Sequence, residues 1–273
     1  DQNCDGEDLP LVVESGGNFN CVIREDGTLE CWGHDGSNKL DSPSDSFTSI
    51  SLGDDHGCGI KTDGTLACWG TNHYNITNPP EGEYVKVSAG YDGYYYSGTC
   101  ALSTTGEIEC WGDHAAYKSP PEGTFIDVDA GYRHACAIDT DGYVNCWGNN
   151  DYWQSTPPLG RFTKVSVGTN FSCALTAEGE VQCWGQNSDN KVSDAPSGTF
   201  VDLKVKYNGS CAINSEGVAT CWGWDSDSYL SATPDKSFIS FSNGYAHSCG
   251  INEDLNVECW GNSGNNRTTV DYD

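Results

Sequence analysis

The residues of this 273-residue chain best suited to chemistry are its fifteen cysteines. Fourteen form seven pairs whose members stand ten positions apart. The pairs are Cys21 and Cys31, Cys58 and Cys68, Cys100 and Cys110, Cys136 and Cys146, Cys173 and Cys183, Cys211 and Cys221, and Cys249 and Cys259. Zinc sites use shorter spacings, such as two residues between cysteines. The pairs therefore predict seven disulfides and a secreted, extracellular or cell-surface protein.

The first residues of the chain match half of a calcium-binding loop, in which oxygen side chains alternate before a glycine. These side chains are Asp1, Asn3 and Asp5. The glutamate that such a loop needs at its twelfth position is replaced by Val12. We therefore interpret residues 1–10 as an acidic segment left from a calcium-binding or linker region. The unpaired Cys4 could bond an upstream cysteine, bond a second chain or stay free.

Catalytic motifs are absent from the sequence. It contains no Gly-x-Ser-x-Gly, no phosphate-binding loop and no His-Glu-x-x-His, and the paired cysteines are assigned to structure. The sequence therefore predicts a protein that is not an enzyme and needs no cofactor, with calcium as the one candidate ion. The alternative is a glycan hydrolase or lyase with acidic and histidine side chains at a central channel.

The elements that hold the cysteines follow from a repeat of about 38 residues. Cys-Trp-Gly occurs seven times, with successive copies 36 to 42 residues apart. In the fifth copy, residues 162–167, 171–176 and 180–184 alternate in hydrophobicity as strands do, and turns separate them. No segment has helical period, so the class is all-β.

The cysteine spacing sets the register of a hairpin in each copy. If Cys136 lies opposite Cys146, residues 140–142 form a three-residue loop whose last residue, Gly142, adopts the left-handed conformation. Directly opposed cysteines are close enough for a disulfide. Five other copies also have glycine there, whereas the seventh has Leu255, which predicts a strained or different turn.

Seven such units, none able to bury its own faces, predict a seven-bladed β-propeller of short antiparallel blades over residues 11–273. The tryptophans of Cys-Trp-Gly point away from their cysteines and should pack between blades. His56, His134 and His247 share one repeat position, two residues before a cysteine. Equivalent positions on adjacent blades are too far apart to share a metal ion, so we expect structural hydrogen bonds.

The repeat resembles that of the regulator of chromosome condensation family. Gly131-Tyr-Arg-His-Ala-Cys-Ala-Ile and Gly244-Tyr-Ala-His-Ser-Cys-Gly-Ile carry the resemblance most clearly. It is closest to the extracellular, cysteine-bearing members, such as the crinkly-type repeats of plant receptor ectodomains, and is similar in layout to secreted bacterial β-lactamase inhibitory proteins. The resemblance implies a propeller that binds proteins through loops on one face of the disc.

Departures from the repeat indicate where a partner would bind. The third copy has five extra residues before its cysteine, and the sixth has Lys206 in place of a turn glycine. Tyrosines on glycine-flanked loops make good protein contacts. The candidate contact residues are Tyr91, Tyr94, Tyr95, Tyr96, Tyr152, Trp153 and Trp224. The alternative is that these aromatics cover the propeller's own apolar surface.

The charge of the chain limits its partners. A formal net charge of -27 repels nucleic acids and anionic membranes, and no apolar run is long enough to insert into a bilayer. No basic and apolar leader opens the sequence, as expected of a processed chain. We expect an extracellular protein partner. The alternatives are a self-assembling surface protein, such as a filament or coat subunit, and a carbohydrate-binding module.

Overall fold

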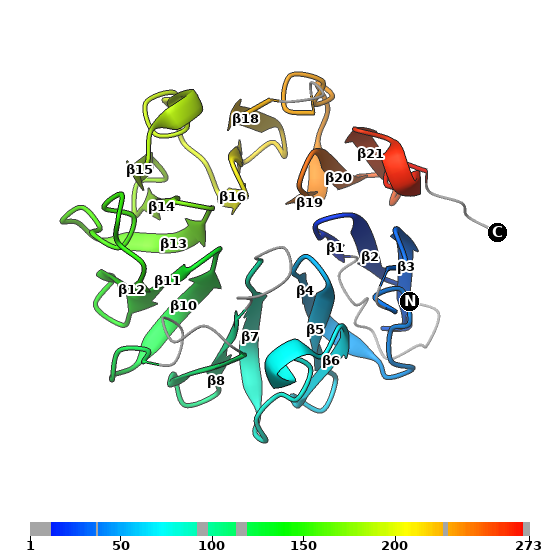
Figure 1. Ribbon diagram of the computed structural model, residues 1–273. Helices are drawn as coiled ribbons and strands as arrows, with labels where there is room; N and C mark the ends of the chain where they lie inside the picture. The colour runs from blue at the N-terminus through cyan, green and yellow to red at the C-terminus, as the bar shows by residue number, and fades with distance from the viewer. Residues whose placement is uncertain (1–11, 37, 92–97, 113–118, 226–228, 270–273) are drawn as a thin grey trace.

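The computed structural model describes residues 12–36, 38–91, 98–112, 119–225 and 229–269. Within them, seven three-stranded antiparallel sheets, each made of consecutive strands, surround a central axis (Figure 1). This arrangement is the predicted seven-bladed propeller. Among the described residues, no helix has the length and apolar character needed to span a bilayer.

Each blade consists of an inner, a middle and an outer strand. The inner strands are β1 (Val12–Ser15), β4 (Phe47–Leu52), β7 (Tyr84–Ala89), β10 (Phe125–Ala130), β13 (Phe162–Val167), β16 (Asp202–Lys206) and β19 (Phe238–Asn243). The middle strands are β2 (Phe19–Ile23), β5 (His56–Lys61), β8 (Gly98–Ser103), β11 (His134–Asp139), β14 (Phe171–Thr176), β17 (Gly209–Ile213) and β20 (His247–Asn252). The outer strands are β3 (Leu29–Gly33), β6 (Leu66–Gly70), β9 (Ile108–Gly112), β12 (Val144–Gly148), β15 (Val181–Gly185), β18 (Ala219–Gly223) and β21 (Val257–Gly261). Short 3-10 helices follow three outer strands: η1 (His73–Asn75), η2 (Ser188–Asn190) and η4 (Gly264–Asn266).

The hairpin register agrees with the one predicted from the cysteine spacing. Cys136 lies directly opposite Cys146, and the other six pairs are opposed in the same way. All seven pairs form disulfides, one per blade, with Cα atoms 4.0 or 4.1 Å apart. Gly142 has a φ of 89°, and Leu255 adopts the same left-handed conformation with a φ of 65°. The seventh turn is therefore strained rather than different.

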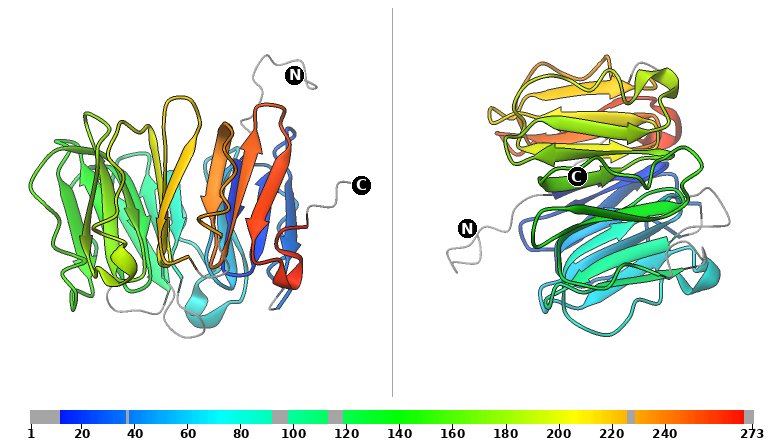
Figure 2. Two further views of the ribbon diagram at one scale, coloured as in Figure 1. Left: turned by 90° about the horizontal axis from the view of Figure 1, so that it is seen from above. Right: turned by 90° about the vertical axis from the view of Figure 1, so that its left-hand side faces the viewer.

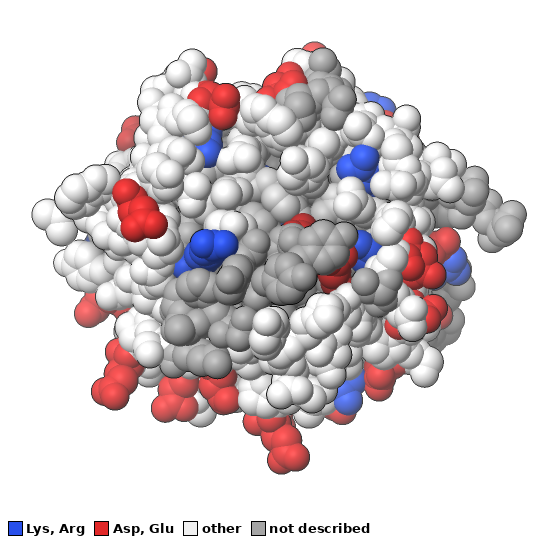
Figure 3. Space-filling view, in the orientation of Figure 1, with Lys and Arg blue, Asp and Glu red and all other residues white. Residues whose placement is uncertain are grey.

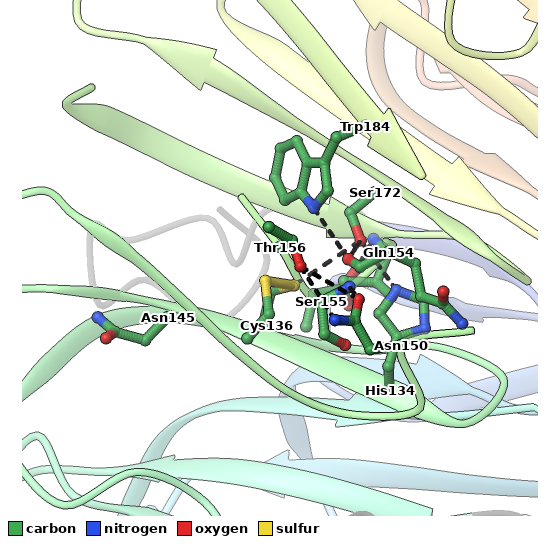
Figure 4. Close-up of a disulfide and its surroundings, with 12 residues drawn as sticks. His134, Cys136, Asn145, Asn150, Gln154, Ser155, Thr156, Ser172 and Trp184 are labelled. Carbon is green, nitrogen blue, oxygen red and sulfur yellow. Dashed lines mark hydrogen bonds between the residues drawn. A yellow bond between two sulfur atoms is a disulfide. The ribbon is translucent and has the colours of Figure 1, made fainter. Parts of the chain in front are cut away.

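Tryptophans join neighbouring blades, as their repeat position predicts. The indole Nε1 of Trp184 donates to the Gln154 carbonyl oxygen at 2.9 Å, and Gln154 belongs to the segment that connects blades four and five (Figure 4). Five more copies make this contact. In them, Trp32 donates to Arg267, Trp69 to Lys39, Trp111 to Ile76, Trp222 to Lys191 and Trp260 to Tyr229. The connecting segments are thus fastened to the blades that follow them.

The recurring histidines also join blades. His134 Nε2 lies 2.9 Å from the Ser172 hydroxyl of the next blade, and His56 makes the equivalent bond to Thr99. His247 Nε2 lies 2.7 Å from the Asn20 amide oxygen, so the same contact connects the last blade to the first. All three side chains are buried, and burial lowers the pKa of His134 to about 3. The expected structural hydrogen bonds are therefore present.

A tyrosine-lined recess on the front face

The two faces of the disc carry different loops. We call front face the one toward the viewer in Figure 1; it carries the turns between inner and middle strands and the segments that follow Cys-Trp-Gly. Seen edge-on, this face lies along the lower edge of the left view in Figure 2. The hairpins between middle and outer strands form the opposite, back face. Connecting segments begin on the front face because each outer strand ends beside the start of its middle strand.

Of the predicted contact residues that the structure describes, three are at least partly exposed and one is buried. Tyr152 and Trp153 are exposed on the front face, with 45% and 72% of their surface accessible, and Trp224 is half-buried there. Tyr91 is only 2% exposed, so its prediction as a surface contact was wrong. Its ring packs against Tyr207 because both extend toward the axis of the propeller. Tyr94, Tyr95, Tyr96, Cys4, Asp1, Asn3 and Asp5 lie outside the described residues, as does the segment 1–10.

One repeat position surrounds the front mouth of the channel. It follows a glycine just after the inner strand in six copies and Lys206 in the sixth, and its seven occupants are Gly17, Asp54, Tyr91, Tyr132, Thr169, Tyr207 and Tyr245. Together with Asn18, Asp55 and Asn208, they line a recess of about 470 Å³. Four of the seven occupants are tyrosines. Aligning the seven copies at this position would have revealed the cluster, but the sequence analysis singled out only Tyr91.

The aromatic rings of the recess form a continuous series. Tyr91 and Tyr207 have ring centroids 4.3 Å apart. Tyr245 lies 5.2 Å from Tyr207 with its ring nearly perpendicular, and Trp224 lies 6.0 Å from Tyr245. These spacings are typical of aromatic pairs that stabilise one another. The series runs from the buried Tyr91 to the exposed edge at Tyr245, so part of it is open to solvent.

Two aspartates supply the charge of the recess. The Tyr207 hydroxyl donates to Asp54, and burial raises the pKa of Asp54 to about 6. Burial together with this carboxylate raises the pKa of Tyr207 well above its usual value, so the hydroxyl keeps its proton. Asp55 accepts from Lys39 Nζ at 2.8 Å. The recess therefore presents carboxylate acceptors that Tyr207 and the neighbouring Lys39 hold in position.

The channel below the recess is a separate cavity of about 270 Å³. Its charged groups have hydrogen-bond partners: Lys204 Nζ lies 3.1 Å from Glu14 Oε1, and Asp129 accepts from the Ser88 hydroxyl and the Val167 backbone N–H. The attraction of Glu14 raises the pKa of Lys204. The three recurring histidines lie between blades and do not line either cavity. The residues that surround the channel thus stabilise one another.

Part of the chain matches a known protein family. The model of the regulator of chromosome condensation (RCC1) repeat matches residues 47–76, 125–154 and 162–190, which belong to three of the blades. The chain is thus a propeller in which three of the seven blades match RCC1 repeats. No curated protein sequence is significantly similar to it.

Solved structures share the fold of this propeller. The ectodomain of the receptor kinase CR4 from Physcomitrella patens superposes with a TM-score of 0.77 at 23% identity, covering 92% of this chain and 73% of that one. The CRINKLY WD40 ectodomain of the Arabidopsis thaliana receptor kinase ACR4 gives 0.76 at 22% identity, covering 96% and 98%. Yeast RCC1 (Prp20), solved with Kap60, gives 0.51 at 14% identity, covering 92% and 69%. At these identities the likeness establishes the fold alone.

The sixth blade of the propeller shapes the floor of the recess. Its inner and middle strands pair as far as Lys206 and Gly209, which leaves a two-residue turn in which Tyr207 has a φ of 51°. Other blades have turns of the same length, as where the Gly53 N–H donates to the His56 carbonyl oxygen, so the sixth turn differs in the left-handed conformation of Tyr207 and not in length. Lys206 Nζ donates to the Ser15 carbonyl oxygen at 2.6 Å and also to that of Leu52. Burial lowers the pKa of this ammonium, which reaches across the channel below the tyrosines.

Proposed function

We propose that this propeller is an extracellular, non-enzymatic module that binds a partner protein through its front face. The observation that carries the proposal is the gathering of exposed aromatic side chains on that face. Trp153, the most exposed of them at 72%, projects from a connecting segment beside Tyr152. Aromatic anchors of this kind dominate the binding energy of protein interfaces. The seven disulfides support an oxidising location.

The segment that carries the two aromatics is well ordered by its own contacts. The Asn150 amide oxygen accepts from the Ser155 backbone N–H at 2.9 Å, and the Gln154 amide oxygen accepts from the Tyr152 backbone N–H at 2.8 Å. Trp153 adopts a left-handed conformation with a φ of 66°. A rigid loop loses little conformational entropy on binding, which favours its use as an anchor.

The surface charge favours partners that are neutral or basic at the contact. Carboxylates gather along the lower edge of the front face in Figure 3. Of the solved structures with this fold, yeast RCC1 is seen bound to Kap60, which is a precedent for a protein partner. The ectodomains CR4 and ACR4 offer the same fold outside the cell. Both likenesses support the proposal by analogy of fold.

Capture from native extracellular material tests the proposal. We would immobilise the oxidised chain, identify bound proteins by mass spectrometry, and repeat the capture with Tyr152→Ala combined with Trp153→Ala. The matched control is Tyr143→Ala, which removes a tyrosine of equal exposure, 46%, from a back-face hairpin. We expect a foreign protein that the double variant loses and the control retains. Recovery of only the chain itself, or no loss with the double variant, would contradict the proposal.

A further inference from the structure

We propose that the tyrosine-lined recess binds a short, neutral saccharide. This site is distinct from the protein contact proposed at Tyr152 and Trp153, and its ligand could be a free sugar or a glycan attached to a protein. The volume of about 470 Å³ falls within the range of roughly 300–1,000 Å³ typical of small-ligand sites. The lining combines aromatic rings with a few polar groups, which is the composition of such sites.

The aromatic rings can stack against the C–H face of a sugar ring. A π-system is negative on its face, so it attracts the weakly positive C–H groups that a pyranose presents on one side. Tyr245 is 46% exposed and stands nearly perpendicular to Tyr207, at 87°. The two rings therefore form two walls at a right angle, and Trp224 extends the aromatic surface beyond Tyr245.

The polar side chains supply both donors and acceptors for hydroxyl groups. Asp54 and Asp55 are acceptors. Asn18 and Asn208 are oriented by cations, because the Asn18 amide oxygen accepts from Arg267 at 3.0 Å and that of Asn208 accepts from Lys191 at 2.8 Å. Each of these two amides keeps its NH₂ group as a donor. A sugar hydroxyl both donates and accepts, so this lining matches polyhydroxylated ligands.

The local charges favour a neutral ligand over an ion. Lys39 already pairs with Asp55, and the Arg133 guanidinium lies 4.6 Å from the centroid of the Tyr132 ring. Neither cation lines the recess, but each contacts a residue that does, so they offset part of the attraction that the two carboxylates would exert on a ligand cation. A ligand anion would meet both carboxylates of the recess and the field of a chain with a formal charge of -27. A neutral polyol avoids this repulsion.

The recess has a solid floor, which a saccharide site needs. Tyr91 lines both the recess and the channel below it, and its hydroxyl donates to the Val167 carbonyl oxygen at 3.1 Å. Tyr91 belongs to the third blade and Val167 to the fifth, so this bond joins two blades that are not adjacent. The buried tyrosine thus separates the open recess from the charged groups of the channel.

Saturation-transfer NMR on the full oxidised chain tests the proposal, with cellobiose, maltose, lactose and N,N′-diacetylchitobiose as probes. We expect at least one disaccharide to bind with millimolar or tighter affinity. Tyr245→Ala should weaken this binding about tenfold or more, whereas Tyr245→Phe keeps the ring and should retain it. Tyr143→Ala, on the back face, should leave it unchanged. Because Tyr245 is half exposed, neither substitution at that position threatens folding.

Three results would overturn the proposal: no transfer to any of the four disaccharides, binding that survives Tyr245→Ala, or binding of N-acetyl-arginine amide in place of the sugars. The disaccharide that binds is then coupled to a carrier protein. Equal affinity per sugar for the free and coupled forms would show that a free saccharide is a sufficient ligand. Tighter binding of the coupled form would identify the ligand as a glycan attached to a protein. Failure here leaves the protein contact at Trp153 untouched, since the two tests use different residues.

Discussion

The contact between a tryptophan and the preceding connecting segment can be tested by Trp222→Phe. Trp222 is 7% exposed and packs with Phe171 and Leu203 between the fifth and sixth blades. Its indole nitrogen donates to the Lys191 carbonyl oxygen at 3.0 Å. Phenylalanine keeps one aromatic ring in the cluster but has no donor and a smaller volume.

The magnitude follows from these two losses. Leaving the buried Lys191 carbonyl without its indole donor costs about 1–3 kcal/mol. The space left by the smaller ring costs about 1–2 kcal/mol more, because packed blades can close it only in part. We therefore expect the free energy of unfolding to fall by about 2–5 kcal/mol.

Urea unfolding of the oxidised protein, followed by far-UV circular dichroism, measures this difference. A loss of stability lowers the urea concentration at the midpoint. It leaves unchanged the slope of the free energy of unfolding against urea concentration. The matched control is Trp153→Phe, whose side chain is 72% exposed, and its effect should stay within about 0.5 kcal/mol. If Trp222→Phe proved no more destabilising than Trp153→Phe, the connecting segments would not be fastened as described.

Three further predictions concern the turn, the histidines and the disulfides. Leu255→Gly should raise the unfolding midpoint by relieving about 1 kcal/mol of left-handed strain, and a lower midpoint in urea would refute the strain. Burial lowers the pKa values of His56 and His134 to about 4 and about 3, so only the unfolded state takes up these protons as pH falls below about 6.5. Stability should therefore decline from pH 6.5 toward 4, with a shallower slope in His134→Gln; an equal slope would argue against a buried neutral ring. Replacing Cys136 and Cys146 together by serine should cost about 2–3 kcal/mol in the same urea assay, and no loss would mean that the hairpin closes without its disulfide.

The local parts of the fold could be predicted from the sequence. The spacing of Cys136 and Cys146 determines the hairpin register, and the register determines where Gly142 must turn. These relations involve residues a few positions apart, so period and spacing are enough to deduce them. The number of blades follows in the same way from the number of Cys-Trp-Gly copies.

Aligning the copies could have shown tyrosine at one repeat position in four blades, but not that their rings meet, because the recess depends on contacts across the axis. Tyr91 comes from the third blade and Tyr207 from the sixth, and only closure of the ring brings their side chains together. The length of the repeat does not determine how close the turns after the inner strands lie to the axis. Because Tyr91 stands at the edge of an extended loop, the sequence predicted it to be a surface contact. The closed propeller buries it under Tyr207 and makes its ring the floor of the site.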